Sequence, residues 1–219
     1  MKVHIVPHGR TTEHIKKGLR AHGAVDKVYL LPSEKFADVA AKLEDDLETF
    51  GYDVERREVD AFDLRSVVDT IVTIAREHTG DDLYINMTGG TNLMAGAATS
   101  SAFFVGATPY YVLEQQDDEA LDELVLSLPS PKQPLTFELS EPQRRVLDQL
   151  GEWDAIGRAG VIGRELGDEL GVSAQKISYH VGKLEEKGLV ETHPDGRQKK
   201  IELSDVGRLY LRWTGGNAG

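Results

Sequence analysis

A glycine-containing turn joins an expected strand to an expected helix at residues 85–94. It reads Ile85-Asn86-Met87-Thr88-Gly89-Gly90-Thr91-Asn92-Leu93-Met94. The backbone amides at the start of a helix attract anions, and glycines let a ligand approach the backbone closely. Thr88, Thr91 and Asn92 add side-chain hydrogen-bond donors. The turn therefore has the composition of an anion-binding site.

A second polar loop, Pro7-His8-Gly9-Arg10-Thr11-Thr12, follows the first expected strand. In a doubly wound sheet both loops lie at the carboxyl edge, where ligands bind. Neither loop matches G-x-G-x-x-G or a Walker loop with its lysine, which disfavours a usual dehydrogenase or NTPase. The alternative to a ligand-binding role for His8 and Arg10 is that both lie in a solvated loop. The candidate ligand-binding residues are His8, Gly9, Arg10, Thr11, Thr88, Gly89, Gly90, Thr91 and Asn92.

A second set of polar and basic side chains lies near the end of the chain. Ile177, Val181 and Leu184 form an apolar stripe along an expected helix, so the residues between them face outward. Such side chains can reach base edges and phosphates. The candidate DNA-binding residues are Ser173, Gln175, Lys176, Ser178, Tyr179 and Lys183 on the helix, and Arg197, Lys199 and Lys200 on a following hairpin. His180 is expected to be half-buried.

No catalytic set and no metal site emerge from the sequence. Cysteine is absent, and the seven histidines lack a metal-site spacing such as H-E-x-x-H. We therefore expect no catalytic residue, no bound metal and no cofactor.

Strands and helices alternate through the first two thirds of the chain, which predicts an α/β fold with a parallel sheet. Strands are expected at 3–6, 27–31, 54–59, 83–86 and 109–113, with an edge strand at 124–128. Helices are expected at 12–21, 34–50, from 64 to near Gly80, and 93–104. In the helix at 34–50, Phe36, Leu43, Leu47 and Phe50 belong to the expected buried stripe.

A proline-rich segment, residues 129–134, separates this part from the rest. Three prolines in six residues favour a semi-rigid linker. The expected domains are therefore 1–128 and 135–219. The second begins with a helix from Ser140, followed by helices at 160–170 and 174–187. A hairpin of strands 189–193 and 198–203 and a last helix at 204–213 follow. Leu189 is expected to close the core.

Negative charge is concentrated in the first part. Residues 1–139 carry 13 basic and 24 acidic side chains, whereas residues 140–219 carry 12 and 13. The uncharged stretch 83–113 contains glycines and Pro109, so it indicates core elements and not a membrane span. We expect no membrane association and a cytoplasmic location.

Helix, short turn, helix and hairpin form the winged helix-turn-helix arrangement. Residues 173–190, Ser-Ala-Gln-Lys-Ile-Ser-Tyr-His-Val-Gly-Lys-Leu-Glu-Glu-Lys-Gly-Leu-Val, resemble the recognition helix and wing entry of bacterial and archaeal winged-helix repressors. The alternative is a protein-contact module with a solvated charged face.

The motif Thr88-Gly89-Gly90-Thr91-Asn92-Leu93-Met94, in an α/β domain joined to a winged helix, resembles archaeal CRISPR-associated Rossmann-fold (CARF) regulators. The resemblance implies a Rossmann-like domain and a homodimer. It also implies that a cyclic oligoadenylate binds across the two-fold axis, on the loops after the first and fourth strands. Many members carry lysine where Asn92 stands, and Arg10 is the residue here that can supply the missing charge.

We expect a ligand-responsive transcriptional regulator that senses a cyclic oligoadenylate, specifically cyclic tetra-adenylate, and binds a double-stranded DNA operator. One alternative is a ring nuclease that cleaves the cyclic ligand, with the winged helix as a dimerisation module. Another keeps the regulator and replaces the ligand with an unrelated nucleotide.

Overall fold

The computed structural model describes residues 1–113, 124–131, 133–196 and 198–215. The chain divides into two compact units, Met1–Leu135 and Thr136–Gly219. No described helix has the length and apolar character needed to cross a membrane.

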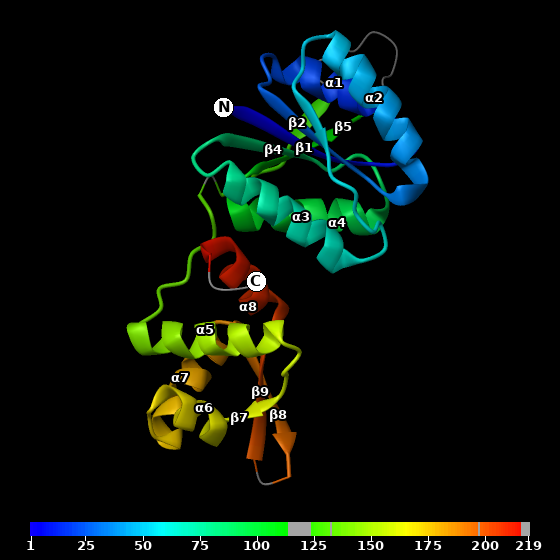
Figure 1. Ribbon diagram of the computed structural model, residues 1–219. Helices are drawn as coiled ribbons and strands as arrows, with labels where there is room; N and C mark the ends of the chain where they lie inside the picture. Colours follow the sequence, from blue (N-terminus) through cyan, green and yellow to red (C-terminus); the bar gives the residue numbers. More distant parts are fainter. Residues whose placement is uncertain (114–123, 132, 197, 216–219) are drawn as a thin grey trace. The chain divides into compact units, whose positions relative to one another are not determined.

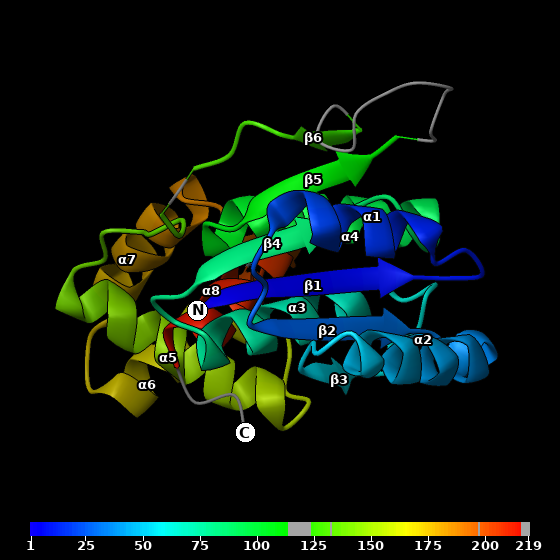
Figure 2. The ribbon, with the colours of Figure 1, turned by 90° about the horizontal axis from the view of Figure 1, so that it is seen from above.

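The N-terminal unit is built on a six-stranded sheet in the order β3-β2-β1-β4-β5-β6. Strands β1 to β5 are parallel neighbours, and β6 runs antiparallel to β5. The strands are β1 (Lys2–His8), β2 (Lys27–Pro32), β3 (Val54–Arg56), β4 (Asp82–Asn86), β5 (Thr108–Val112) and β6 (Val125–Ser127). The sequence thus predicts this parallel sheet and its edge strand correctly, and Figure 2 shows the strands side by side.

Helices cover both faces of this sheet. α1 (Glu13–His22) and α2 (Ala37–Thr49) lie on one face, and α3 (Leu64–Glu77) and α4 (Asn92–Val105) on the other (Figure 1). Residues 3–8 of β1 are all buried because both faces of that central strand are covered. Val6, Ile15, Leu19, Leu30 and Leu47 belong to the core cluster under α1 and α2.

The helix expected at 34–50 differs in its ends. It begins with a short 3-10 turn, Glu34–Phe36, and α2 stops at Thr49. Leu43 and Leu47 are buried as predicted, but Phe50 is 65% exposed, so its assignment to the buried stripe is wrong. Phe50 lies at the helix C-cap, beyond the last turn that faces the sheet. Strand β3 also ends three residues early, at Arg56.

The proline-rich segment contacts the N-terminal unit. The Ser130 hydroxyl donates to the Ala107 carbonyl at 3.0 Å, and the Leu135 amide donates to the Phe104 carbonyl at 2.8 Å. The division between units accordingly falls after Leu135.

The described residues of the C-terminal unit form four helices and a three-stranded sheet in the order β7-β9-β8. Its elements are α5 (Glu141–Ala155), β7 (Val161–Ile162), α6 (Gly163–Leu170), α7 (Ala174–Glu186), β8 (Val190–Asp195), β9 (Gln198–Leu203) and α8 (Asp205–Thr214). α5 begins as expected from Ser140, whose amide donates to the Gln143 side chain at 2.9 Å.

One expected helix start is wrong. The sequence predicts a helix from Gly160, but Val161 and Ile162 pair with Ile201 and Lys200 of β9. Two consecutive β-branched residues suit a strand, and the partner strand lies 40 residues further along the chain. α6 therefore starts at Gly163.

Candidate functional site

The two predicted ligand loops meet at the carboxyl edge of the sheet. β1 and β4 are parallel neighbours that end at His8 and Asn86. A Cβ placed on Gly9 would lie 3.6 Å from the Cα of Gly90, so the loop backbones are in contact. The structure thus brings together residues 8–12 and 86–92.

The start of α4 leaves backbone donors available. The hydroxyl of Thr91 caps the helix, accepting from the Met94 amide at 3.2 Å and donating to the Ala61 carbonyl at 2.9 Å. Among the described residues, the amides of Asn92 and Leu93 have no acceptor. Two free amides at the positive end of a 14-residue helix can hold an anion. The Thr91 side chain itself is occupied by the helix cap.

Thr88 and Gly90 shape the turn. The Thr88 hydroxyl accepts from the Val112 amide at 2.7 Å, and the Thr88 amide donates to the Asn86 side-chain oxygen at 2.8 Å. Gly90 has a φ of 84°, and a Cβ there would lie 2.7 Å from the Met94 sulfur. Both the backbone conformation and the lack of space therefore require glycine at this position.

One histidine that is not among the predicted ligand-binding residues lies within the ligand site. His14, in the first turn of α1, has its Nε2 2.6 Å from the place a Cβ on Gly89 would take. Burial, with a smaller contribution from the neighbouring His8, lowers the pKa of His14 to about 4. The spacing of six residues between His8 and His14, across a loop into a helix, is the sequence signal that could have found it.

His8 is fully buried and does not stand in a solvated loop. Its Nδ1 lies 3.2 Å from the Gly9 carbonyl oxygen, and burial lowers its pKa. The Nε2 atoms of His8 and His14 are both buried without a partner in the described part of the chain. The site thus contains two neutral imidazoles with unused hydrogen-bonding capacity.

Arg10, Thr11, Gly90 and Asn92 are the exposed members of the predicted set. Within the described ranges no side chain pairs with Arg10, so its guanidinium is available to an anion. The same ranges contain no cluster of three metal-ligating side chains. The arrangement offers backbone amides and a guanidinium, a donor set suited to a phosphate-containing ligand.

The predicted recognition helix is α7. Ser173 caps it by accepting from the Lys176 amide at 3.4 Å, and Ile177, Val181, Leu184 and Leu189 are buried as predicted. The side chains of Gln175, Lys176, Ser178 and Tyr179 are exposed, Tyr179 by 63%. His180 is half-buried, again as predicted.

The remaining basic candidates differ in their surroundings. The Lys183 ammonium is 2.8 Å from Glu186, and the Lys200 ammonium is 3.5 Å from Asp195. Lys199 is exposed without an ion-pair partner among the described residues. Arg197 lies outside the described residues. Gly196 has a φ of 59° at the hairpin tip, in agreement with the predicted turn.

A family model described as HFX_2341_N:-like, N-terminal matches residues 2–117, more than half of the chain. The chain belongs to this family. The region shared with the HFX_2341_N:-like family contains both ligand loops and His14. A protein of Archaeoglobus fulgidus described as an uncharacterized protein is 25% identical over 232 aligned positions, covering 97% of this chain and 98% of its own length.

The MarR family model matches residues 139–201 of this HFX_2341_N:-like chain. Similar solved structures include a probable transcriptional regulator from Pseudomonas aeruginosa, at 27% identity and a TM-score of 0.32. That match covers 36% of this chain and 58% of the other. The PcaV transcriptional regulator from Streptomyces coelicolor, in complex with its natural ligand, is 27% identical with a TM-score of 0.31, covering 38% and 59%. The C-terminal unit is a MarR-type winged helix-turn-helix domain.

Proposed function

We propose that this protein is a ligand-responsive transcriptional regulator. The N-terminal unit binds a cyclic oligoadenylate at the carboxyl edge of its sheet, and the C-terminal unit binds operator DNA. The observation that carries the proposal is the meeting of two polar loops around the free amides of Asn92 and Leu93, in a chain that also has a MarR-type domain.

The donor set supports an anionic ribonucleotide as the ligand. The α4 amides and the Arg10 guanidinium suit a phosphodiester, because both donate to its charged oxygens. The Nε2 of neutral His8 can accept one hydrogen bond, because its Nδ1 donates to the Gly9 carbonyl, and the Nε2 of His14 is also without a partner among the described residues. Both atoms suit ribose hydroxyls or base edges. Asn92 contributes no charge, so Arg10 is the cation of this ligand site.

The proposed protein is a homodimer, and a two-fold symmetric site suits a cyclic ligand. A two-fold axis near the loops would place two copies of residues 88–92 face to face, and a ring of identical nucleotides presents matching phosphates to both. Each protomer would then contribute the same amides and the same Arg10. The recognition helices of the two copies would bind two half-sites of an operator.

The proposal is tested by measuring operator affinity with and without cyclic tetra-adenylate. The operator is selected from a pool of random duplexes with the intact protein. The parent should show a several-fold change in affinity on ligand addition, since couplings of about 1–3 kcal/mol are typical. Arg10→Gln should bind operator normally and lose the response, while Arg76→Gln, an exposed arginine on α3, should retain it.

Equal operator affinity for the parent with and without bound cyclic tetra-adenylate would refute the sensor role. Accumulation of linear products during the incubation would instead support the ring nuclease. Operator binding that responds to another nucleotide, with no binding of cyclic tetra-adenylate, would keep the regulator and replace the ligand.

A further inference from the structure

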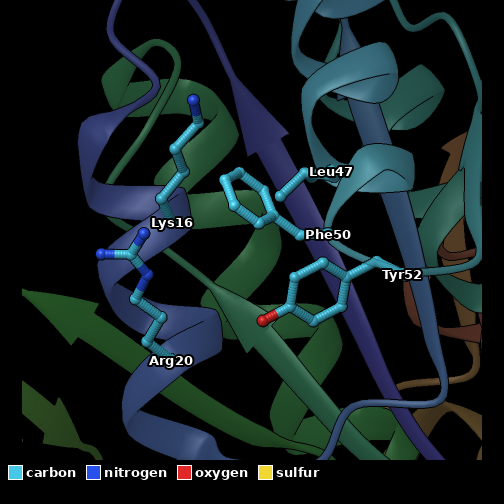
Figure 3. A pocket seen from close by; sticks show the side chains of 5 residues that line it. All are labelled: Lys16, Arg20, Leu47, Phe50 and Tyr52. Atoms are coloured by element: carbon cyan, nitrogen blue, oxygen red, sulfur yellow. The ribbon is translucent and has the colours of Figure 1, made fainter.

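A pocket of about 200 Å³ opens between α1 and the end of α2, away from the ligand loops. Lys16 and Arg20 of α1 form one wall, and Leu47, Phe50 and Tyr52 form the other (Figure 3). Arg20 is near the C-terminal end of α1, and Tyr52 precedes the start of β3. The pocket therefore lies toward the amino edge of the parallel sheet, opposite the edge that holds residues 8–12 and 86–92.

The end of α2 places both aromatic rings at this pocket. Gly51 has a φ of 88°, which lets the chain reverse directly after the helix. The Tyr52 amide then donates to the Leu47 carbonyl at 3.1 Å. Leu47 is buried and belongs to the core cluster, Tyr52 packs against that cluster, and Phe50 remains 65% exposed. Leu47 and Tyr52 of this wall are thus held by the core.

The opposite wall is cationic. The Lys16 ammonium is 2.7 Å from Asp46, which neutralises much of its charge. The Arg20 guanidinium has no acceptor or carboxylate partner among the described residues, and the hydroxyl of Tyr52 points toward α1 in Figure 3. None of the described residues that line the pocket carries a carboxylate. The unpaired guanidinium beside two aromatic rings is therefore a local positive charge in a unit with excess negative charge.

We propose that this pocket is a second binding site, for a small aromatic carboxylate of benzoate size. The ring would pack against Phe50, Tyr52 and Leu47, burying apolar surface that the protein leaves open. The carboxylate would pair with Arg20, whose planar fork of donors matches two oxygens. The volume accommodates one six-membered ring with its carboxylate and is too small for a cyclic oligonucleotide.

The test is an NMR titration of the intact protein with benzoate, with benzamide as the neutral ligand of the same shape. Benzoate should shift the backbone signals of Leu47 and Tyr52 saturably, and benzamide should bind at least about tenfold more weakly, since it lacks the charge that pairs with Arg20. Arg20→Gln should weaken benzoate binding by a similar factor. Arg76→Gln, which removes the same charge on α3, should leave benzoate affinity unchanged.

Three outcomes would overturn the proposal. The first is equal affinity for benzoate and benzamide, and the second is unchanged benzoate affinity in Arg20→Gln. The third is the absence of saturable shifts at residues 47–52. None of these readouts involves DNA or cyclic tetra-adenylate, so this site can be rejected without affecting the proposed sensor function.

Discussion

The imidazole of His14 lies directly against the backbone of Gly89, with Nε2 2.6 Å from the place of a Cβ on that glycine. The Pro7 carbonyl oxygen is 2.8 Å from the same place. A methyl group there would push the two ligand loops apart. Gly89→Ala should therefore cost about 1–3 kcal/mol in the free energy of unfolding and weaken cyclic tetra-adenylate binding.

Gly182→Ala is the matched control, because a Cβ on Gly182 meets no atom within 4 Å. It lies inside helix α7 and should stabilise the protein by about 0.5–1 kcal/mol without changing ligand affinity. Urea unfolding and calorimetric titration measure both quantities. Unchanged stability and ligand binding in Gly89→Ala would show that the loops are not packed as described.

Substitution of Thr91 tests whether its hydroxyl acts as a helix cap. The oxygen accepts from the Met94 amide and the hydroxyl donates to the Ala61 carbonyl, so Thr91→Val loses both hydrogen bonds while nearly retaining the shape. We expect a loss of about 1–2 kcal/mol in the free energy of unfolding. Thr91→Ser keeps the hydroxyl and should remain close to the parent. If the two variants are equally stable in urea, the cap is unimportant.

The buried His4 predicts that stability falls with acid. Its Nδ1 is 3.0 Å from the Tyr110 hydroxyl, and its ring stacks on Tyr84. Burial lowers the pKa of His4 to about 3, with smaller contributions from the nearby His22 and Lys2. Below the unfolded pKa of about 6.5 the unfolded chain binds a proton that the folded chain does not. This contribution to stability is therefore present above pH 6.5 and is lost as the pH falls toward 3.

Between pH 7 and pH 4 the loss from His4 should be about 3 kcal/mol. Urea unfolding of the parent and of His4→Gln at pH 7, 6, 5 and 4 measures it. The variant should be less stable at pH 7 and should show a shallower dependence on pH. Parallel pH curves for the two proteins would contradict a neutral, buried His4.

The basic residues of the C-terminal unit should differ in their effect on DNA binding. Lys176 and Lys199 are exposed without an ion pair among the described residues, whereas Lys183 already contacts Glu186. Replacing Lys176 or Lys199 with alanine should weaken binding to all sequences and reduce the salt slope by about 0.9 per lost phosphate contact. Lys183→Ala should have a smaller effect, and Gln175→Ala should change which operator is preferred.

Binding of each variant to operator and to random duplex is measured over a range of salt concentrations. Lys42→Ala, on the exposed side of α2, controls for the change in net charge. The assignment of the wing is wrong if Lys199→Ala matches the Lys42→Ala control at every salt concentration.

An exposed, uncharged face of α4 predicts a dimer of the N-terminal units. Leu93, Gly96, Ser100 and Phe103 are exposed at spacings of three and four, with Phe103 38% exposed. Phe103→Asp would place a charge in such an interface and should shift the protein to a 24.1 kDa monomer in sedimentation at micromolar concentration. Phe50→Asp, outside α4, should leave the dimer intact. A monomeric parent would refute the interface.

Local patterns in the sequence determined the order and type of the elements. Short apolar segments that alternate with helical stripes predict β1 to β6, and the stripe Ile177, Val181 and Leu184 identifies the buried side of α7. The capping residues Ser140 and Ser173 mark helix starts that the structure contains. These features succeed because short apolar runs, helix periodicity and capping depend on residues only a few positions apart.

Tertiary structure decided the features that depend on distant partners. β7 exists because Val161 and Ile162 meet β9, and His14 enters the ligand site because α1 packs beside the turn at Gly89. The Thr91 hydroxyl is occupied by Ala61, thirty residues earlier in the chain. Arg20 faces Phe50 and Tyr52 only because two helices pack on the same face of the sheet. Burial and hydrogen-bond partners at such separations arise when the chain closes around its core, and the spacing of residues along the sequence does not encode them.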